Sequence, residues 1–252
     1  MSIIARLDID DSAFEAAFAR LLVSPAEADV GLVGTVSDIV AAVAQEGDAA
    51  LLSLTNELDH RSLVDASSLH LDKHAMEAAA APAESSVRDA LSLAAGRIRD
   101  FHEHQLAQSW QYEDDLGTIL GQRVSPLDRV GVYVPGGRAS YPSSVLMNAI
   151  PAKVAGVAEV VMVVPAPHDE ISSAVMAAAC LAGVDQVVTI GGAQAIAALA
   201  YGTETVPTVD KIVGPGNRFV AEAKRQVFGR VGIDMVAGPS EILIIADGSV
   251  PP

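Results

Sequence analysis

Hydrophobic residues in the first hundred positions recur at intervals of three and four, the spacing that places side chains on one face of an α-helix. This pattern predicts a series of amphipathic helices in the N-terminal part of the chain. A short strand is also possible over residues 67–71. The helical segments are residues 14–22, 36–43 and 51–58, a helix that starts at Asp72, and a longer helix from Pro82 to about Gln108.

After Trp110 the pattern changes to short segments rich in Val, Ile and Tyr, which favour β-structure. Residues 118–124 and 129–134 predict a hairpin that leads into a core strand. Beyond this point short apolar strands alternate with helical segments, which is typical of a parallel sheet with crossover helices. Strands are predicted at 131–134, 160–164, 186–190, 211–213, 232–236 and 241–247, with helices from Ser143, Glu170, Ala193 and Asn217.

The fold class expected from this order is α/β, with a helical N-terminal region and an incomplete Rossmann-like parallel sheet that has helices on both faces. In such sheets ligands bind at the carboxyl ends of the strands. The predicted loops at that edge are rich in glycine and proline: Pro135-Gly-Gly, Pro165-Ala-Pro, Gly191-Gly-Ala-Gln, Gly214-Pro-Gly-Asn and, later, Gly238-Pro-Ser-Glu. Glycine allows close backbone approach, and a helix N-terminus attracts phosphate. Together the loops indicate a nucleotide crevice, although any one of them taken alone is better explained as a tight turn.

Four polar residues in these loops could orient a ligand by hydrogen bonds: Tyr133, Gln194, Asn217 and Ser240. Each could also be a turn or cap residue. The Gly-x-Gly-x-x-Gly fingerprint is missing, because Phe219 stands where its third glycine belongs, and no acidic residue closes the next strand to hold a ribose.

The amino-acid composition excludes several classes of binding partner. Thirty-two acidic residues against sixteen basic ones give a formal net charge of −16, which repels nucleic acid and anionic lipid. Apolar runs are too short to cross a membrane, and the N-terminus lacks the features of a secretion signal. A single cysteine, Cys180, cannot form an internal disulfide, which favours a reducing cytoplasm. Because Cys180 lies among alanines, it is expected to be a buried, inert thiol.

No metal site and no catalytic residue emerges from the histidines. His102 and His104 are two positions apart, so on a helix they point to different faces, and His-Glu-x-x-His is absent. The remaining histidines have no spacing that defines a site. We therefore expect them to be structural or surface residues.

Five segments in order resemble the histidinol dehydrogenase family. The resemblance is strongest from about residue 129 to residue 247. The segments are Arg129-Val-Gly-Val-Tyr-Val-Pro-Gly-Gly, Tyr141-Pro-Ser-Ser-Val-Leu-Met-Asn, Gly191-Gly-Ala-Gln-Ala-Ile-Ala-Ala-Leu-Ala-Tyr-Gly-Thr-Glu, Val209-Asp-Lys-Ile-Val-Gly-Pro-Gly-Asn and Asp234-Met-Val-Ala-Gly-Pro-Ser-Glu.

The resemblance implies a cytoplasmic homodimer that oxidises L-histidinol through histidinal to L-histidine in two NAD-dependent steps. It also implies a zinc ion that holds the substrate and a Glu-His pair for acid–base work. By the same resemblance Tyr133, Gln194 and Asn217 would contact NAD, and Ser240 would contact the substrate. The implied domains are a mainly helical region with a hairpin at 1–128, a Rossmann-like NAD-binding domain at 129–236, and at 237–252 the first strand of a returning substrate and zinc domain.

The family's zinc-ligand motif Gln-Ala-Glu-His and its Glu-His pair would follow the last predicted strand, whereas the sequence ends at Pro252. We therefore expect a C-terminally truncated dehydrogenase that has no metal ligands or catalytic residues of its own and is inactive alone. The alternative is a non-catalytic short paralogue that binds NAD or dimerises.

Overall fold

The computed structural model describes residues 6–22, 30–136, 141–236 and 244. The chain divides into two compact units, one made of residues 1–34 with 238–252 and the other of residues 35–237. In the first unit, helix α1 (Phe14–Leu22) stacks Phe14 on Phe18 one turn later, with 5.5 Å between the ring centroids. The second unit contains the sheet and the cavities described below.

The centre of the second unit is a six-stranded sheet of order β1-β6-β5-β4-β7-β8. The five strands from β4 to β8 run parallel, and only the edge strand β1 is antiparallel, with His70 opposite Val188 in β6. The predicted α/β class with a mostly parallel sheet is thus confirmed. The strands are β1 (His70–Leu71), β4 (Arg129–Tyr133), β5 (Glu159–Val163), β6 (Gln186–Val188), β7 (Lys211–Val213) and β8 (Gly232–Ile233).

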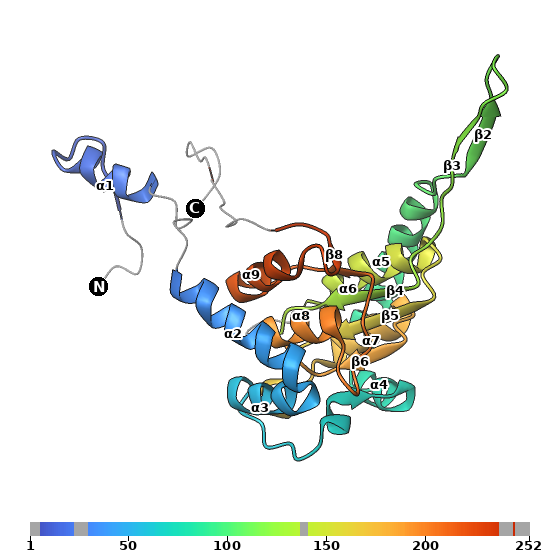
Figure 1. Cartoon of the computed structure of the whole chain (residues 1–252). Helices are drawn as coiled ribbons and strands as arrows, with labels where there is room; N and C mark the ends of the chain where they lie inside the picture. The colour runs from blue at the N-terminus through green and yellow to red at the C-terminus, as the bar shows by residue number, and fades with distance from the viewer. Residues whose placement is uncertain (1–5, 23–29, 137–140, 237–243, 245–252) are drawn as a thin grey trace. The chain divides into compact units, whose positions relative to one another are not determined.

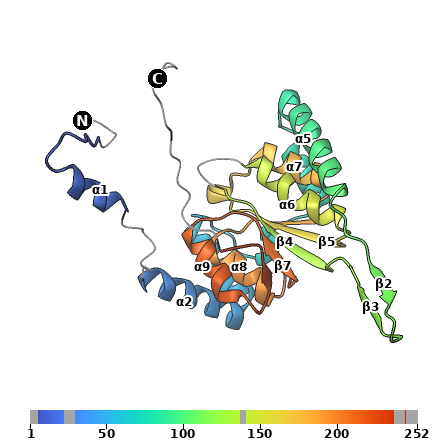
Figure 2. The same cartoon turned by 90° about the horizontal axis from the view of Figure 1, so that it is seen from above.

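Helices cover both faces of this sheet (Figures 1 and 2). Helices α4 to α7 pack against one another on one face, whereas α3, α8 and α9 lie on the other. The helices are α2 (Val30–Glu46), α3 (Asp48–Leu58), α4 (Lys73–Ala80), α5 (Ser85–Glu103), α6 (Pro142–Val154), α7 (Ser173–Ala182), α8 (Gly192–Tyr201) and α9 (Arg218–Val227). None of the helices in the described residues is both long and apolar enough to span a membrane.

Alternation along β4 shows how the two faces form. Val130 and Val132 are buried in the apolar cluster beneath α6 and α7, and successive strand residues point to opposite faces. Gly131 faces the other side, where an added β-carbon would lie only 2.8 Å from Leu199 of α8. A glycine inside this strand therefore allows α8 to pack close to the sheet.

Two predicted element boundaries differ from the structure in the N-terminal half. The strand is confined to residues 70–71, because the Asp65 side chain accepts a hydrogen bond from the Ser67 N–H and turns Ala66–Leu69 into a 3-10 helix, η1. Helix α5 begins at Ser85 and ends at Glu103, and so is shorter at both ends than the predicted 82–108.

Differences also occur after the parallel strands. The helix expected from Glu170 begins at Ser173, after a 3-10 turn, η2 (Pro167–Asp169), and Ser172 caps it. The strand expected at 232–236 is only two residues long, because the Met235 N–H bonds to the Asp234 side chain rather than to a neighbouring strand. The strand predicted at 241–247 lies outside the described residues, apart from position 244.

A two-stranded hairpin projects from the second unit (Figure 1). Strand β2 (Trp110–Glu113) pairs with β3 (Ile119–Gln122), and all eight of their residues are exposed. The paired strands thus begin earlier than the predicted segment 118–124. Asp114 forms the turn by accepting hydrogen bonds from the N–H groups of Leu116 and Thr118.

Candidate functional site

A cavity of about 520 Å³ opens at the carboxyl ends of the parallel strands. It is built by the segments that follow β4, β5, β6 and β7, together with residues of α2 and α3. This is the edge where sheets of this kind bind ligands. Its lining consists of Thr35, Ile39, Leu58, Asp59, Tyr133, Pro135, Gly136, Pro165, Pro167, Gly192, Ala193, Gln194, Asn217 and Phe219.

Tyr133 is the last residue of β4 and is 3% exposed. Its hydroxyl accepts a hydrogen bond of 3.1 Å from the N–H of Gly192, at the first turn of α8. Burial raises the pKa of Tyr133 to about 12; the Asp59 carboxylate also raises it, and the Gly192 N–H lowers it. The phenol is therefore neutral at physiological pH and keeps its own proton for donation into the cavity.

Gln194 lies in the first turn of α8 and is 1% exposed. Its Oε1 atom has no hydrogen-bond partner among the described residues. Gly192 has a φ of +62°, and an added β-carbon would be 2.6 Å from this oxygen. A buried polar atom without a partner is costly unless a ligand or water satisfies it, so Gln194 fits a ligand that brings a hydrogen-bond donor.

Asn217 precedes α9 and caps it. Its Oδ1 atom accepts hydrogen bonds from the N–H groups of Phe219 (3.0 Å) and Val220 (3.1 Å). The expectation that Asn217 could be a cap is thus met, and the residue also lines the cavity. Capping fixes the N-terminal end of α9, which carries a partial positive charge, beside the cavity.

The structure therefore brings three of the four predicted residues, Tyr133, Gln194 and Asn217, into one cavity. The fourth, Ser240, lies outside the described residues. The unpartnered Gln194 oxygen can accept a hydrogen bond from a ligand, and the neutral Tyr133 hydroxyl can donate one. The helix N-termini carry a partial positive charge that attracts phosphate. These groups fit a dinucleotide such as NAD.

The glycines of the strand-end loops serve mainly to pack the loops against one another. A β-carbon on Gly191 would lie 2.5 Å from the Pro165 side chain, and one on Gly136 would lie 2.8 Å from the same proline. The absence of side chains thus lets the loops after β4, β5 and β6 come together into one wall. Gly136 and Gly192 also form part of the cavity lining.

The loop after β7 is fixed by a nearly buried ion pair. Lys224 of α9 donates from Nζ to the Gly214 carbonyl oxygen (2.6 Å) and to Asp234 Oδ1 (2.7 Å), and the Gly214 N–H donates to the other Asp234 oxygen (2.9 Å). Burial raises the pKa of Asp234, but the Lys224 ammonium and the N–H groups of Met235 and Gly214 outweigh it, so the net pKa is lowered. The pair holds the Gly214 turn beside Asn217.

Asp59 also lines the cavity, and it was not among the predicted site residues. It is the C-cap of α3 and is 7% exposed, and its Oδ2 atom has no partner among the described residues. Burial raises the pKa of this carboxyl above the ordinary value, although the Ala166 backbone N–H, Arg61 and His60 lower it. The sequence did contain a signal for Asp59. This residue directly follows the helix predicted at 51–58, and a carboxylate is disfavoured at the negative C-terminal end of a helix.

Two expectations about metal-binding and reactive side chains can be compared with the structure. Within the described residues no group of three His, Cys, Asp or Glu side chains could hold a metal ion. The expectation that Cys180 is buried was wrong, since its side chain is exposed on α7. Its pKa is raised, mainly by partial desolvation and by the charge of Glu77, which keeps the thiol protonated and slow to react.

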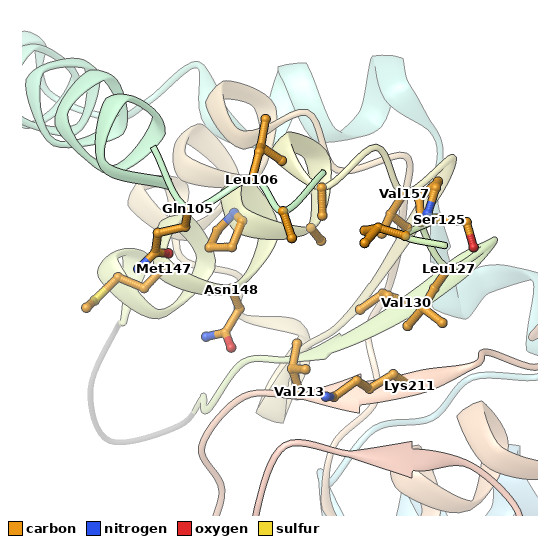
Figure 3. A pocket seen from close by; sticks show the side chains of 16 residues that line it. Gln105, Leu106, Ser125, Leu127, Val130, Met147, Asn148, Val157, Lys211 and Val213 are labelled. Carbon is orange, nitrogen blue, oxygen red and sulfur yellow. The ribbon is translucent and has the colours of Figure 1, made fainter. Parts of the chain in front are cut away.

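A second cavity, of about 600 Å³, lies at the opposite end of the strands (Figure 3). Its walls come from the segment that follows α5, from the segment before β4, from α6 and from β4 and β7, with Val130, Met147 and Lys211 among them. The lining is mostly apolar, and none of the predicted site residues belongs to it. The cavity at the carboxyl edge is therefore the better candidate for the functional site.

The fold and the first cavity define the class to which the protein belongs: α/β proteins with a mostly parallel sheet and a cavity at the carboxyl ends of its strands. Comparison with known proteins then identifies the family. The family model for histidinol dehydrogenase matches residues 24–252, so the chain belongs to the histidinol dehydrogenase family, as the five sequence segments predicted.

Curated relatives are similar over nearly the whole chain. Histidinol dehydrogenase of Acinetobacter baylyi is 58% identical over 243 residues, which are 96% of this chain and 56% of the relative. The enzyme of Chromobacterium violaceum is 62% identical over 224 residues, 89% of this chain and 52% of that one. The chain thus spans about half the length of the curated relatives that it matches.

A solved structure supports the same fold. The crystal structure of histidinol dehydrogenase from Elizabethkingia anophelis superimposes with a TM-score of 0.80 at 32% sequence identity, covering 89% of this chain and 52% of that chain.

Proposed function

We propose that the cavity at the carboxyl edge binds NAD and that the chain forms the cofactor-binding part of a dehydrogenase that oxidises L-histidinol through histidinal to L-histidine, in histidine biosynthesis. The observation that carries this proposal is the meeting of Tyr133, Gln194 and Asn217 in one cavity. Family membership supports the substrate and the pathway. The chemistry supplied by NAD in such a reaction is hydride acceptance, once in each oxidation.

Three residues would hold the dinucleotide in this proposal. The Tyr133 hydroxyl, which already accepts the Gly192 N–H, donates its proton to a polar atom of the ligand. Gln194 accepts a hydrogen bond through its buried Oε1 atom. Asn217 caps α9 and so fixes the positive N-terminal end of this helix beside the pyrophosphate. The apolar walls, including Pro165 and Phe219, exclude water from the bound cofactor.

Zinc does not fit the described residues, and we derive no step through it. The resemblance assigns the zinc ligands and the Glu-His pair to positions beyond residue 252. We therefore propose that turnover requires those residues in addition, with Ser240 at the substrate. On the same basis we propose the domain roles given above, with NAD binding at 129–236 and substrate and zinc binding from 237 onward.

A cytoplasmic homodimer is the proposed working form. The β2–β3 hairpin exposes Trp110, Tyr112 and Ile119 by 54%, 54% and 68%, and an isolated two-stranded hairpin is only marginally stable in water. Association with a second copy would bury these side chains. The single cysteine requires no oxidising compartment.

Two measurements test the proposal. Isothermal titration of NAD into the purified chain should show saturable binding, which Tyr133→Phe and Gln194→Leu weaken. Tyr201→Phe is the matched control, since Tyr201 ends α8 outside the cavity. NAD reduction should then be followed with L-histidinol and zinc, in this chain and in one extended through the family's C-terminal region.

The outcomes separate the proposed function from its alternative. Turnover only in the extended protein supports a dehydrogenase whose cofactor site lies in these residues. NAD binding without turnover in either protein favours a non-catalytic nucleotide-binding relative. Absence of NAD binding in both would refute the assignment of the cavity.

A further inference from the structure

Dinucleotide-binding proteins of the Gly-x-Gly-x-x-Gly type carry an acidic residue beside the nucleotide; in this chain Asp59 is an acidic residue that lines the cavity. In those proteins an Asp or Glu at the end of the second strand binds a ribose hydroxyl. Here the corresponding strand, β5, ends in Val163 and is followed by Val164 and Pro165, with no acidic side chain. That position lacks its ribose ligand.

Asp59 comes to the cavity from another part of the chain. Its carbonyl oxygen accepts a hydrogen bond of 2.9 Å from the N–H of His168, in the 3-10 turn that follows β5. Its carboxylate also interacts with the backbone N–H of Ala166 in the same loop. The end of α3 is thus attached to the loop after β5, and Asp59 lines the cavity next to a strand end that carries no acidic residue of its own.

The Asp59 carboxylate can accept a further hydrogen bond. Asp59 is more than nine-tenths buried, it lines the cavity, and Oδ2 has no partner among the described residues. Gln194 Oε1, in the same cavity, is a second buried acceptor without a partner. Two such acceptors match the hydroxyl groups of a ribose, whereas phosphate oxygens have no proton to donate.

We propose that Asp59 accepts a hydrogen bond from the 2′-hydroxyl of the adenosine ribose and so selects NAD over NADP. This inference rests on the proposed NAD site. Leu58 and Ile39, which line the cavity beside Asp59, offer an apolar wall for the adenine. The 2′-phosphate of NADP would place two negative groups together in a buried site, which is strongly unfavourable.

The test compares Asp59→Asn with the unmodified chain by isothermal titration of NAD and NADP. The amide keeps the shape and the acceptor for Ala166 but removes the charge. NAD should bind the variant about tenfold to a hundredfold more weakly, as for loss of a hydrogen bond to a charged group. The unmodified chain should bind NADP at least tenfold more weakly than NAD. The Asp59→Asn change should weaken NADP binding much less than NAD binding, so that the preference for NAD over NADP becomes smaller. Glu170→Gln makes the same change of charge in the same loop outside the cavity and should leave both affinities unchanged.

Folding of the variant is not expected to be impaired. The folded-state pKa of Asp59 is raised, so its contribution to stability is present below pH 3.8 and is lost as the pH rises through the raised value. Ionisation of Asp59 therefore destabilises the ligand-free fold, and Asp59→Asn should melt no lower than the unmodified protein. As a second measurement that needs no variant, 2′-deoxy-NAD should bind the unmodified chain at least tenfold more weakly than NAD.

Each result has a distinct meaning. Weaker NAD binding by Asp59→Asn, with a smaller preference over NADP, supports the inference. Unchanged NAD affinity in the variant, or equal affinity of the unmodified chain for 2′-deoxy-NAD, overturns it and leaves the proposed NAD site intact. If neither the unmodified chain nor the extended protein binds NAD, the proposed function fails and the inference fails with it.

Discussion

Lys224→Met removes the cation from the nearly buried pair that holds the Gly214 turn. The Lys224 side chain is 4% exposed and that of Asp234 is 28% exposed. Methionine keeps most of the apolar stem but leaves Asp234 without its counter-charge and the buried Gly214 carbonyl without its donor. Breaking a fully buried pair destabilises by about 3–5 kcal/mol. Because Asp234 is partly solvated, we expect a loss of about 2–3 kcal/mol in the free energy of unfolding.

The neighbouring residue provides the matched control. Arg225 pairs with Glu222 at 2.7 Å in the same helix, but its side chain is 55% exposed. Solvent screening weakens the attraction between two such exposed charges, so Arg225→Met should lower the free energy of unfolding by less than about 1 kcal/mol. Urea unfolding followed by far-ultraviolet circular dichroism measures both variants. A loss in Lys224→Met no larger than that in Arg225→Met would refute the reasoning, which relies on burial rather than on distance.

The pH dependence of unfolding gives a second signature of the same pair. The folded-state pKa of Asp234 is lowered, so the stability it contributes is present above the unfolded value of 3.8 and is lost as the pH falls through the lowered value. Lys224→Met should diminish this acid-side loss. An unchanged pH profile below pH 4 would show that other groups hold the Asp234 carboxylate in its ionised form.

Three further predictions concern other parts of the second unit. Gly192→Ala should destabilise the protein by about 1–2 kcal/mol, measured by urea unfolding, because φ is +62°; it should also weaken NAD binding in titrations by displacing Gln194. Arg61→Met should destabilise by about 3 kcal/mol in urea, since its buried guanidinium bonds to the Thr189 carbonyl at 2.9 Å and hydroxyl at 3.0 Å. Cys180 should react fully with Ellman's reagent without denaturant because it is exposed, but more slowly at pH 8 than free cysteine because its pKa is raised.

Local sequence was sufficient to predict the parts of the site that follow the strands directly. Tyr133 ends β4, Gln194 opens α8 and Asn217 caps α9. Each lies next to a Gly- or Pro-containing turn, and parallel strands bring their carboxyl ends to one edge of the sheet. Knowing the order of strands and helices therefore sufficed to predict that these residues meet.

Contacts between distant segments could not be predicted in the same way. Asp59 joins the site through the His168 N–H, more than a hundred positions later, and no local pattern specifies that pairing. The packing of Gly191 could not be predicted for the same reason, because Pro165, its nearest neighbour across the space that a side chain would fill, belongs to another loop. Cys180 was misjudged because its alanine neighbours do not show which face of α7 the sheet covers.

The free-energy cost of burying the Asp59 carboxylate at this position supports the inference that it binds a ligand. The carboxylate lies at the C-terminal end of α3, where the helix dipole disfavours negative charge, and it is buried with one oxygen unpartnered. His60, His168 and Asp169 around it have φ values of +52°, +55° and +63°, a conformation that costs about 1–3 kcal/mol in residues other than glycine. An asparagine at position 59 would retain the acceptor for Ala166 without a buried charge. Strain and desolvation gathered at a cavity wall are typical of sites built for a ligand, and a ribose hydroxyl would offset part of both.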